Sequence, residues 1–140
     1  MINTDIPLEI IKKFNKNTLF DHLGMEVTKL GSDFIEGTMP VDRRTVQPLG
    51  LLHGGASAAL IESLGSIGSS LIIDRNKSGI VGLEVNANHI KGVKSGIITG
   101  TAKIVHEGRT THIWQVDLKD ENKTLVATGR LTVLIIDLKK

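Results

Sequence analysis

The sequence predicts an α+β fold in which one long helix packs against an antiparallel sheet of five or six strands. Residues 54–73 have the length of a helix, and an apolar stripe at helical spacing crosses them, formed by Leu60, Leu64, Ile67 and Leu71. From Gly79 onward, apolar and polar residues alternate in segments separated by turn signals at KSG, HEGR and DENK. Such spacing is typical of consecutive antiparallel strands.

Shorter elements precede the long helix. Pro7 signals the start of a helix over about residues 5–16, and LFDHLG reads as one further turn. The apolar face of the first helix consists of Ile6, Ile10 and Phe14. Residues 25–41 contain two strand-like runs around a Gly-Ser-Asp turn, which predict a hairpin. The expected strands after the long helix lie in GIVGLEVNANHI, GIITGTAKIV, THIWQVDLKD and TLVATGRLTVLII.

The composition is typical of one globular domain over residues 1–140, with residues 1–19 as a helical extension. The chain is 40% hydrophobic and 23% charged, which excludes a disordered protein. Its 3% aromatic content argues against a stacking surface for nucleic acid, and the lack of cysteine excludes disulfides, thiolate metal sites and cysteine nucleophiles. Since the N-terminus has no apolar signal segment, we expect a cytoplasmic protein with no nucleic-acid or membrane partner.

Glu62 is the only residue with a permanent formal charge between Arg44 and Asp74. On a helical wheel it lies roughly opposite the apolar stripe, and its neighbours on that side are small rather than charged: Ala58, Ala59, Ser66 and Ser69. Small residues let another backbone approach closely, so this side of the helix is expected to meet a second chain. A carboxylate there is either catalytic or structurally buried, and the residues alone favour neither.

The HGG motif at residues 53–55 leads into the long helix. Its glycines leave the first helical N–H groups open to an oxygen that gathers negative charge, although they could equally serve a tight turn capped by His53. Gly54 and Glu62 are eight residues apart, or about 12 Å along a helix. One carbonyl can therefore touch both groups only if they come from two chains.

The segments QPLGLLHGGASAALIESLGS and VGLEVNANHIK resemble the hot-dog-fold acyl-CoA thioesterases of the aryl-CoA type, and the resemblance runs over about residues 20–136. It combines HGG with a Gln six residues before the His, a Glu nine residues after it, and N-x-N-H downstream. It implies a hot-dog fold, in which the sheet wraps the long helix. It also implies a homodimer with shared active sites, assembled as a dimer of dimers, that is, a homotetramer.

The resemblance further implies hydrolysis of an acyl-CoA thioester, either an aryl-CoA such as 1,4-dihydroxy-2-naphthoyl-CoA or benzoyl-CoA, or a medium-chain acyl-CoA. Glu62 falls on the family's carboxylate, which acts as nucleophile or general base, and the Gly54 N–H falls on its oxyanion donor. The family's polar helpers match Gln47, His53 and Ser66. The candidates for substrate or CoA contacts are Gly55, Ser63, His89, Lys91 and Arg109. No metal and no cofactor are expected, because coenzyme A is part of the substrate.

Two other functions remain open. A hot-dog hydratase or dehydratase would use a catalytic His with a differently placed acidic partner, and the spacing from HGG to Glu favours hydrolysis instead. A non-catalytic acyl-CoA-binding or sensor module is the alternative outside the enzymes. Such regulators usually carry a DNA-binding segment, and the short N-terminal helix is too small for a helix-turn-helix.

Overall fold

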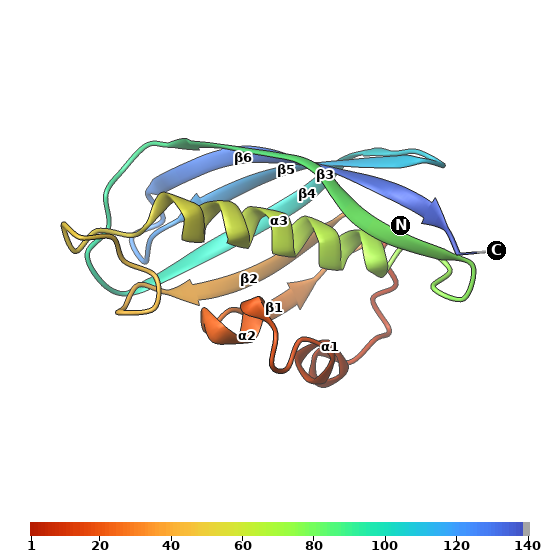
Figure 1. The fold of residues 1–140 in the computed structure, drawn as a ribbon, viewed down its shortest axis with the longest axis horizontal. Helices are drawn as coiled ribbons and strands as arrows, with labels where there is room; N and C mark the ends of the chain where they lie inside the picture. The colour runs from red at the N-terminus through yellow and green to blue at the C-terminus, as the bar shows by residue number, and fades with distance from the viewer. Residues whose placement is uncertain (139–140) are drawn as a thin grey trace.

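The computed structural model describes residues 1–138 of the 140-residue chain. Its elements, in chain order, are α1 (Leu8–Phe14), α2 (Leu19–His22), β1 (Glu26–Leu30), β2 (Phe34–Pro40), α3 (Gly54–Ser70), β3 (Ser78–His89), β4 (Ile97–Glu107), β5 (Thr111–Lys119) and β6 (Leu125–Asp137) (Figure 1). The predicted long helix, hairpin and strands are confirmed. The long helix ends at Ser70 rather than at residue 73, and the first helix is shorter than the predicted 5–16.

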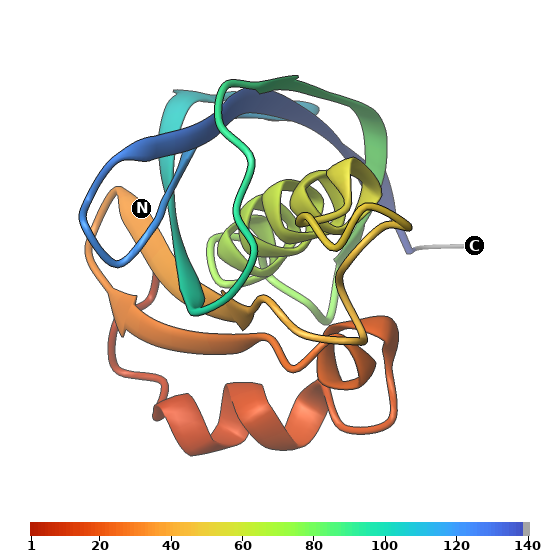
Figure 2. The ribbon, with the colours of Figure 1, turned by 90° about the vertical axis from the view of Figure 1, so that its left-hand side faces the viewer.

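Within the described residues, six strands form one antiparallel sheet in the order β1-β2-β4-β5-β6-β3. Hairpins join β1 to β2, β4 to β5 and β5 to β6, whereas β3 lies at the edge beyond β6. The sheet curls around α3, which runs through its concave side (Figure 2). A long helix wrapped by an antiparallel sheet is the predicted architecture. No helix within residues 1–138 is long and apolar enough to cross a membrane.

The apolar stripe of α3 faces the sheet, as predicted. Leu60 and Leu64 are fully buried, Leu71 is buried just after the helix, and Ile67 is partly buried against the same core. Burying a leucine side chain contributes about 1.5–3 kcal/mol, so this stripe is a main source of the helix's stability. The expectation that Ser69 lies on the opposite, open side is wrong, because Ser69 is fully buried against β5. The partly exposed side of α3 is therefore narrower than predicted and consists of Ala58, Ala59, Glu62 and Ser66.

Two glycines let α3 approach the sheet more closely than a larger residue would allow. A Cβ at Gly68 would lie 2.5 Å from the Trp114 ring of β5, and one at Gly65 would lie 2.6 Å from Leu131 of β6. Trp114 and Leu131 are fully buried. The indole ring therefore packs directly on the helix backbone, and glycine's cost to helix stability is offset by this contact.

A buried polar network links α3 to β5. The Ser69 hydroxyl accepts a hydrogen bond from Trp114 Nε1 at 2.8 Å and lies 3.0 Å from His112 Nδ1. Ser69 and His112 are both buried, and burial lowers the pKa of His112 because the charged imidazolium loses its hydration. One hydroxyl thus satisfies two ring nitrogens inside an otherwise apolar core.

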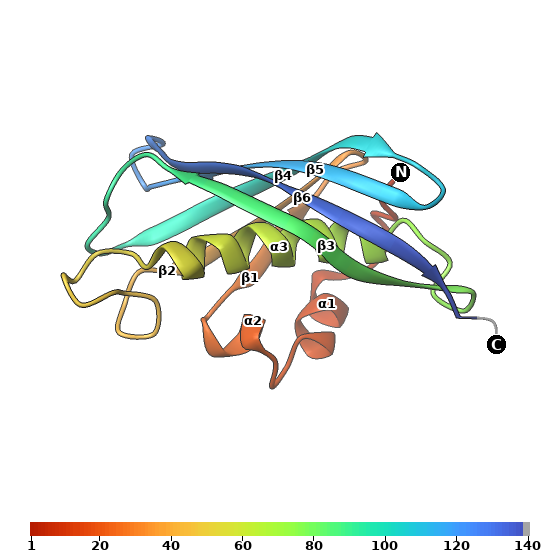
Figure 3. The ribbon, with the colours of Figure 1, turned by 45° about the horizontal axis from the view of Figure 1, so that its top comes forward.

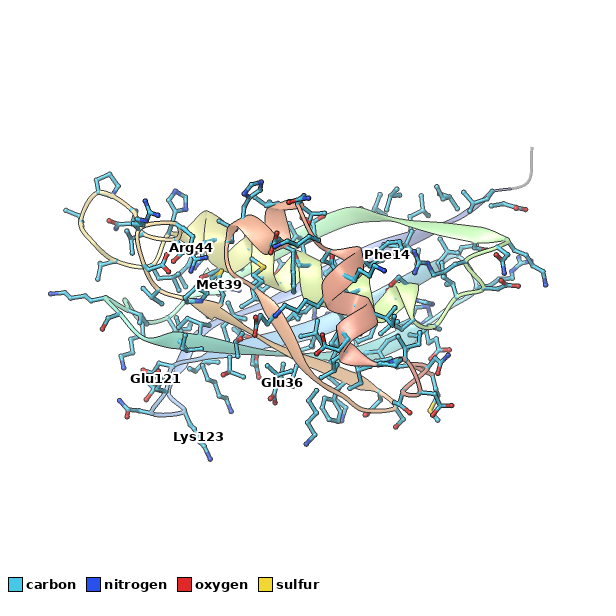
Figure 4. The ribbon with its side chains drawn as sticks, turned by 90° about the horizontal axis from the view of Figure 1, so that it is seen from below. Phe14, Glu36, Met39, Arg44, Glu121 and Lys123 are labelled. Carbon is cyan, nitrogen blue, oxygen red and sulfur yellow. The ribbon has the colours of Figure 1, made fainter. Side chains whose placement is uncertain are left out.

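The N-terminal segment covers the β1 side of the molecule (Figure 4). Ile11 is the buried residue of α1, and Lys12 holds the helix to β1 through an ion pair of 3.3 Å with Glu26. The apolar face predicted for α1 is not buried as a whole, because Ile10 and Phe14 remain 53% and 66% exposed. These two side chains border a hollow instead of filling the core.

Ser69→Ala should lower the free energy of unfolding by about 1–3 kcal/mol, because Trp114 Nε1 would lose its acceptor and remain buried. Urea unfolding followed by circular dichroism measures this change. Ser70→Ala is the matched control, since the Ser70 hydroxyl bonds only to the Ile67 carbonyl of its own helix. Equal stability of Ser69→Ala and Ser70→Ala would contradict the role given to the network.

Candidate active site

The candidate site lies along the seam where α3 and the edge strand β3 run side by side in opposite directions (Figure 3). Two contacts mark this seam, Gly54 with His89 at the start of the helix and Glu62 with Gly82 in its middle. Near the far end, Ser66 and Ile80 line one hollow. The seam therefore carries the predicted oxyanion donor and the predicted carboxylate at separate places.

At the start of α3, capping leaves a single free backbone donor. His53 Nδ1 accepts the Gly55 N–H at 2.7 Å, and the His53 carbonyl accepts the N–H groups of Ala56 and Ser57. The Gly54 N–H has no acceptor among residues 1–138. Since a helix N-terminus carries partial positive charge, this N–H is available to an oxygen that develops negative charge.

His53 and Gly55 thus have a capping role in the structure. The His53 backbone is extended (φ −69°, ψ 129°), as an N-cap residue requires, and its ring turns back onto the helix start. The ring and the Gly55 N–H satisfy each other. They fix the first turn of α3 and leave the Gly54 N–H as the group directed outward.

A hollow of about 260 Å³ opens beside Gly54. Its polar lining consists of Gln47, Ser57, His89 and Lys91. His89 packs over Gly54, where a Cβ would lie 2.9 Å from the ring Nε2. The Gln47 side-chain oxygen accepts the Leu49 N–H, which fixes the amide and leaves its NH₂ group as a donor. The same small cavity is therefore lined by the start of α3 at Gly54, by Gln47 and by His89.

Glu62 projects from the middle of α3 toward β3. Its carboxylate lies against the Gly82 backbone so closely that a Cβ at position 82 would collide with Oε1. Glu62 is half-buried, and none of the described residues gives it a hydrogen bond or an ion pair. A half-buried carboxylate without a hydrogen-bond partner is free to interact with a bound molecule.

The strand beside Glu62 is irregular and apolar. Gly82 pairs with Val133 and Glu84 with Thr132, so Leu83 is the extra residue of a β-bulge. Leu83 is 61% exposed and Val81 43%, on a strand at the sheet edge. Exposed apolar side chains on an edge strand with free backbone groups form a surface suited to pairing with another chain.

Ser66 and Ser63 differ in their positions. Ser66 lies one turn after Glu62 and lines a second hollow, which α1 covers. No hydrogen bond joins it to Glu62 in the part of the chain that the structure describes. Ser63 is half-buried and lines neither hollow. Ser66 therefore lies on the same side of α3 as Glu62, whereas Ser63 is not placed at either hollow.

The basic candidates fall at two ends of the molecule. His89 and Lys91 lie beside Gly54, and Lys91 forms an ion pair of 2.7 Å with Asp120, which lowers the pKa of that carboxyl group. Arg109 precedes β5, whereas Asp120 follows it. Nine residues of strand, about 30 Å, separate them, so one chain does not bring Arg109 to the helix start.

Two residues of the candidate site were not predicted from the sequence. Gly82 supports the Glu62 carboxylate, and Ser57 lines the cavity at Gly54. A glycine inside a strand pattern often marks a bulge or a close backbone approach, so the sequence could have indicated that Gly82 is unusual. Nothing in the sequence around Ser57 indicates that it lines a cavity. No group of three or more His, Asp or Glu side chains that could hold a metal occurs in residues 1–138.

Comparison with known proteins identifies the family. Residues 49–127, more than half of the chain, match the sequence profile described as the Thioesterase superfamily. The chain belongs to this family of hydrolases. This assignment confirms the resemblance in the HGG and Glu62 segments, and with it the hot-dog fold.

Relatives of nearly the same length support the assignment. The chain is 40% identical over 131 residues to the 1,4-dihydroxy-2-naphthoyl-CoA hydrolase of Escherichia coli, covering 94% of this chain and 96% of that protein. It is 43% identical to a proofreading thioesterase of Cronobacter turicensis, covering 92% and 93%. The crystal structure of a mutant thioesterase from Pseudomonas aeruginosa has a TM-score of 0.95 and 42% identity, covering 98% and 99%.

Gly54→Pro should lower kcat for thioester hydrolysis by about 100- to 1,000-fold, because it removes the free N–H. Proline fits the first position of a helix, and the preceding His53 already has the extended backbone that proline demands. Steady-state assays of released thiol measure the effect. Gly54→Ala meets His89 with the same Cβ but keeps the N–H, so the difference between the two variants isolates the donor. Equal losses in both would contradict its role.

Proposed function

We propose that this thioesterase hydrolyses acyl-CoA thioesters, aryl or medium-chain, at a site shared by two chains. The observation that carries the proposal is the isolated carboxylate of Glu62 on the helix whose N-terminus keeps one free N–H at Gly54. One group is a base or nucleophile, and the other is an oxyanion donor. Together, a base or nucleophile and an oxyanion donor can catalyse acyl transfer from a thioester to water.

In the proposed reaction, the thioester carbonyl oxygen accepts the Gly54 N–H, assisted by the Gln47 amide. Glu62 then either attacks the carbonyl carbon or removes a proton from a water that attacks it. The tetrahedral intermediate collapses with loss of the CoA thiolate. If Glu62 attacks, the collapse leaves a mixed anhydride on Glu62, which water then hydrolyses to the free acid, and the proton released by this water protonates the thiolate. If water attacks, the free acid forms directly and the proton that Glu62 took up passes to the thiolate. By either route one water is consumed, and the products are the free acid and CoA. Every step uses groups of the chain and water.

Two chains are required because α3 is continuous between Gly54 and Glu62. The helix separates them by about 12 Å, too far for one carbonyl to reach both in the same chain. A two-fold partner that pairs along β3 would set its helix start against Glu62 and would cover Val81 and Leu83. Such a dimer supplies two identical sites and completes the environment of both carboxylates.

The CoA portion of the substrate is assigned to the cavity beside Gly54. His89 and Lys91 are there, and both can donate to phosphate oxygens, Lys91 after exchanging its ion pair with Asp120. The names of two relatives, a naphthoyl-CoA hydrolase and a proofreading thioesterase, agree with a thioester substrate.

Hydrolysis of butanoyl-, hexanoyl-, benzoyl- and 1,4-dihydroxy-2-naphthoyl-CoA by the wild type and by Glu62→Gln tests the proposal. The wild type should cleave at least one ester, and Glu62→Gln should lose at least about 1,000-fold in kcat, because the amide can neither attack nor accept the proton. Circular dichroism controls for folding. Binding without cleavage by the wild type, or full activity of Glu62→Gln, would instead indicate a non-catalytic acyl-CoA-binding module.

A further inference from the structure

A second hollow, of about 430 Å³, lies between α1, the end of α3 and the start of β3. This volume falls in the range of small-molecule binding sites. Its apolar lining includes Ile6, Ile10, Phe14, Ile67, Leu71 and Ile80. We call this hollow the α1 pocket.

Apolar side chains at this pocket are exposed although their helix is well anchored. Ile11 alone fixes α1 in the core, while Ile10 and Phe14 keep more than half of their surface in contact with solvent. The Arg75 guanidinium lies over the Phe14 ring, 4.1 Å from its centroid, and this cation–π contact holds the ring at the rim of the pocket. Large exposed apolar groups around a hollow indicate a binding surface.

The α1 pocket lies next to Glu62 along the seam between α3 and β3. Ser66, one turn beyond Glu62 on α3, lines it, and so does Ile80, two residues before Gly82 on β3. Glu62 itself is not part of the lining. The pocket therefore begins about one helical turn from the carboxylate, whereas the cavity assigned to the CoA portion lies at the start of α3.

We propose that the α1 pocket binds the acyl group of the substrate, and that Ile10 and Phe14 determine which acyl groups fit. This inference rests on the proposed function. Most of the pocket lining is apolar, and three of its polar side chains already have partners. Asn15 and Ser70 donate to carbonyls of their own helices, and the Arg75 guanidinium lies over the Phe14 ring. This lining favours an apolar acyl group, an aromatic ring or a medium-length chain, since apolar surface is what most of the pocket offers.

The dependence of kcat/KM on acyl length tests the inference. For straight-chain acyl-CoA from four to twelve carbons, each further buried CH₂ should raise kcat/KM of the wild type about fourfold until the pocket is full. Phe14→Ala and Ile10→Ala should lower the values for octanoyl-CoA about tenfold. Butanoyl-CoA, whose chain is four carbons shorter, should change by less than about twofold, because it buries less apolar surface in the pocket. Leu19→Ala, an equally exposed residue of α2 outside the pocket, is the matched control.

A binding measurement separates this inference from the proposed function. In the Glu62→Gln background, calorimetry should give tighter binding of octanoyl-CoA than of butanoyl-CoA, and adding Phe14→Ala should remove most of the difference. Active wild type with an acyl-length profile unchanged by Phe14→Ala and Ile10→Ala would overturn the pocket assignment and leave hydrolysis standing. A change in oligomeric state without a change in the profile would also overturn it, since the surface would then be a contact between chains.

Discussion

The close contact between α3 and the concave side of the sheet is the constraint on which the rest of the structure depends. Gly65 and Gly68 bring the helix backbone onto Trp114 and Leu131, and Ser69 ties it to β5 through two ring nitrogens. With that side of the helix fixed in the core, its partly exposed side beside β3 is formed by Ala59, Glu62 and Ser66. The position of Glu62 on this side therefore follows from packing that lies in the core.

The same helix controls the electrostatics at its N-terminus. His53 uses its ring and its carbonyl to satisfy the three N–H groups that follow Gly54, so capping both stabilises the helix and selects one outward donor. The Gly54 donor and the Glu62 carboxylate each lack a partner among the described residues. In the proposed dimer, association along β3 would bring the two groups together and cover the apolar edge, so the stability of that dimer would be linked to the assembly of the site.

Much of this architecture could be predicted from the sequence, because local periodicity determined it. The stripe of α3 and the alternation in β4 to β6 each match one regular structure, and the isolated charge of Glu62 indicated an unusual position. Tertiary packing, which the sequence pattern does not show, determines which apolar residues are buried and which candidate residues lie close together. Ile10 and Ile11 are equally apolar, and only the contact with the core shows that Ile11 is buried. The separation of Arg109 from Lys91 depends on strand order, which spacing along the chain does not reveal.

Subunit mixing tests the central claim, a thioester site shared by two chains, most directly. Glu62→Gln and Gly54→Pro, each nearly inactive alone, would be unfolded, mixed in equal amounts and refolded, and the hydrolysis rate compared with that of wild type treated alike. Random pairing gives mixed dimers as half of the population, each with one doubly altered site and one intact site. A shared site should therefore restore about a quarter of the wild-type rate. A rate no higher than the mean of the two variants would contradict it.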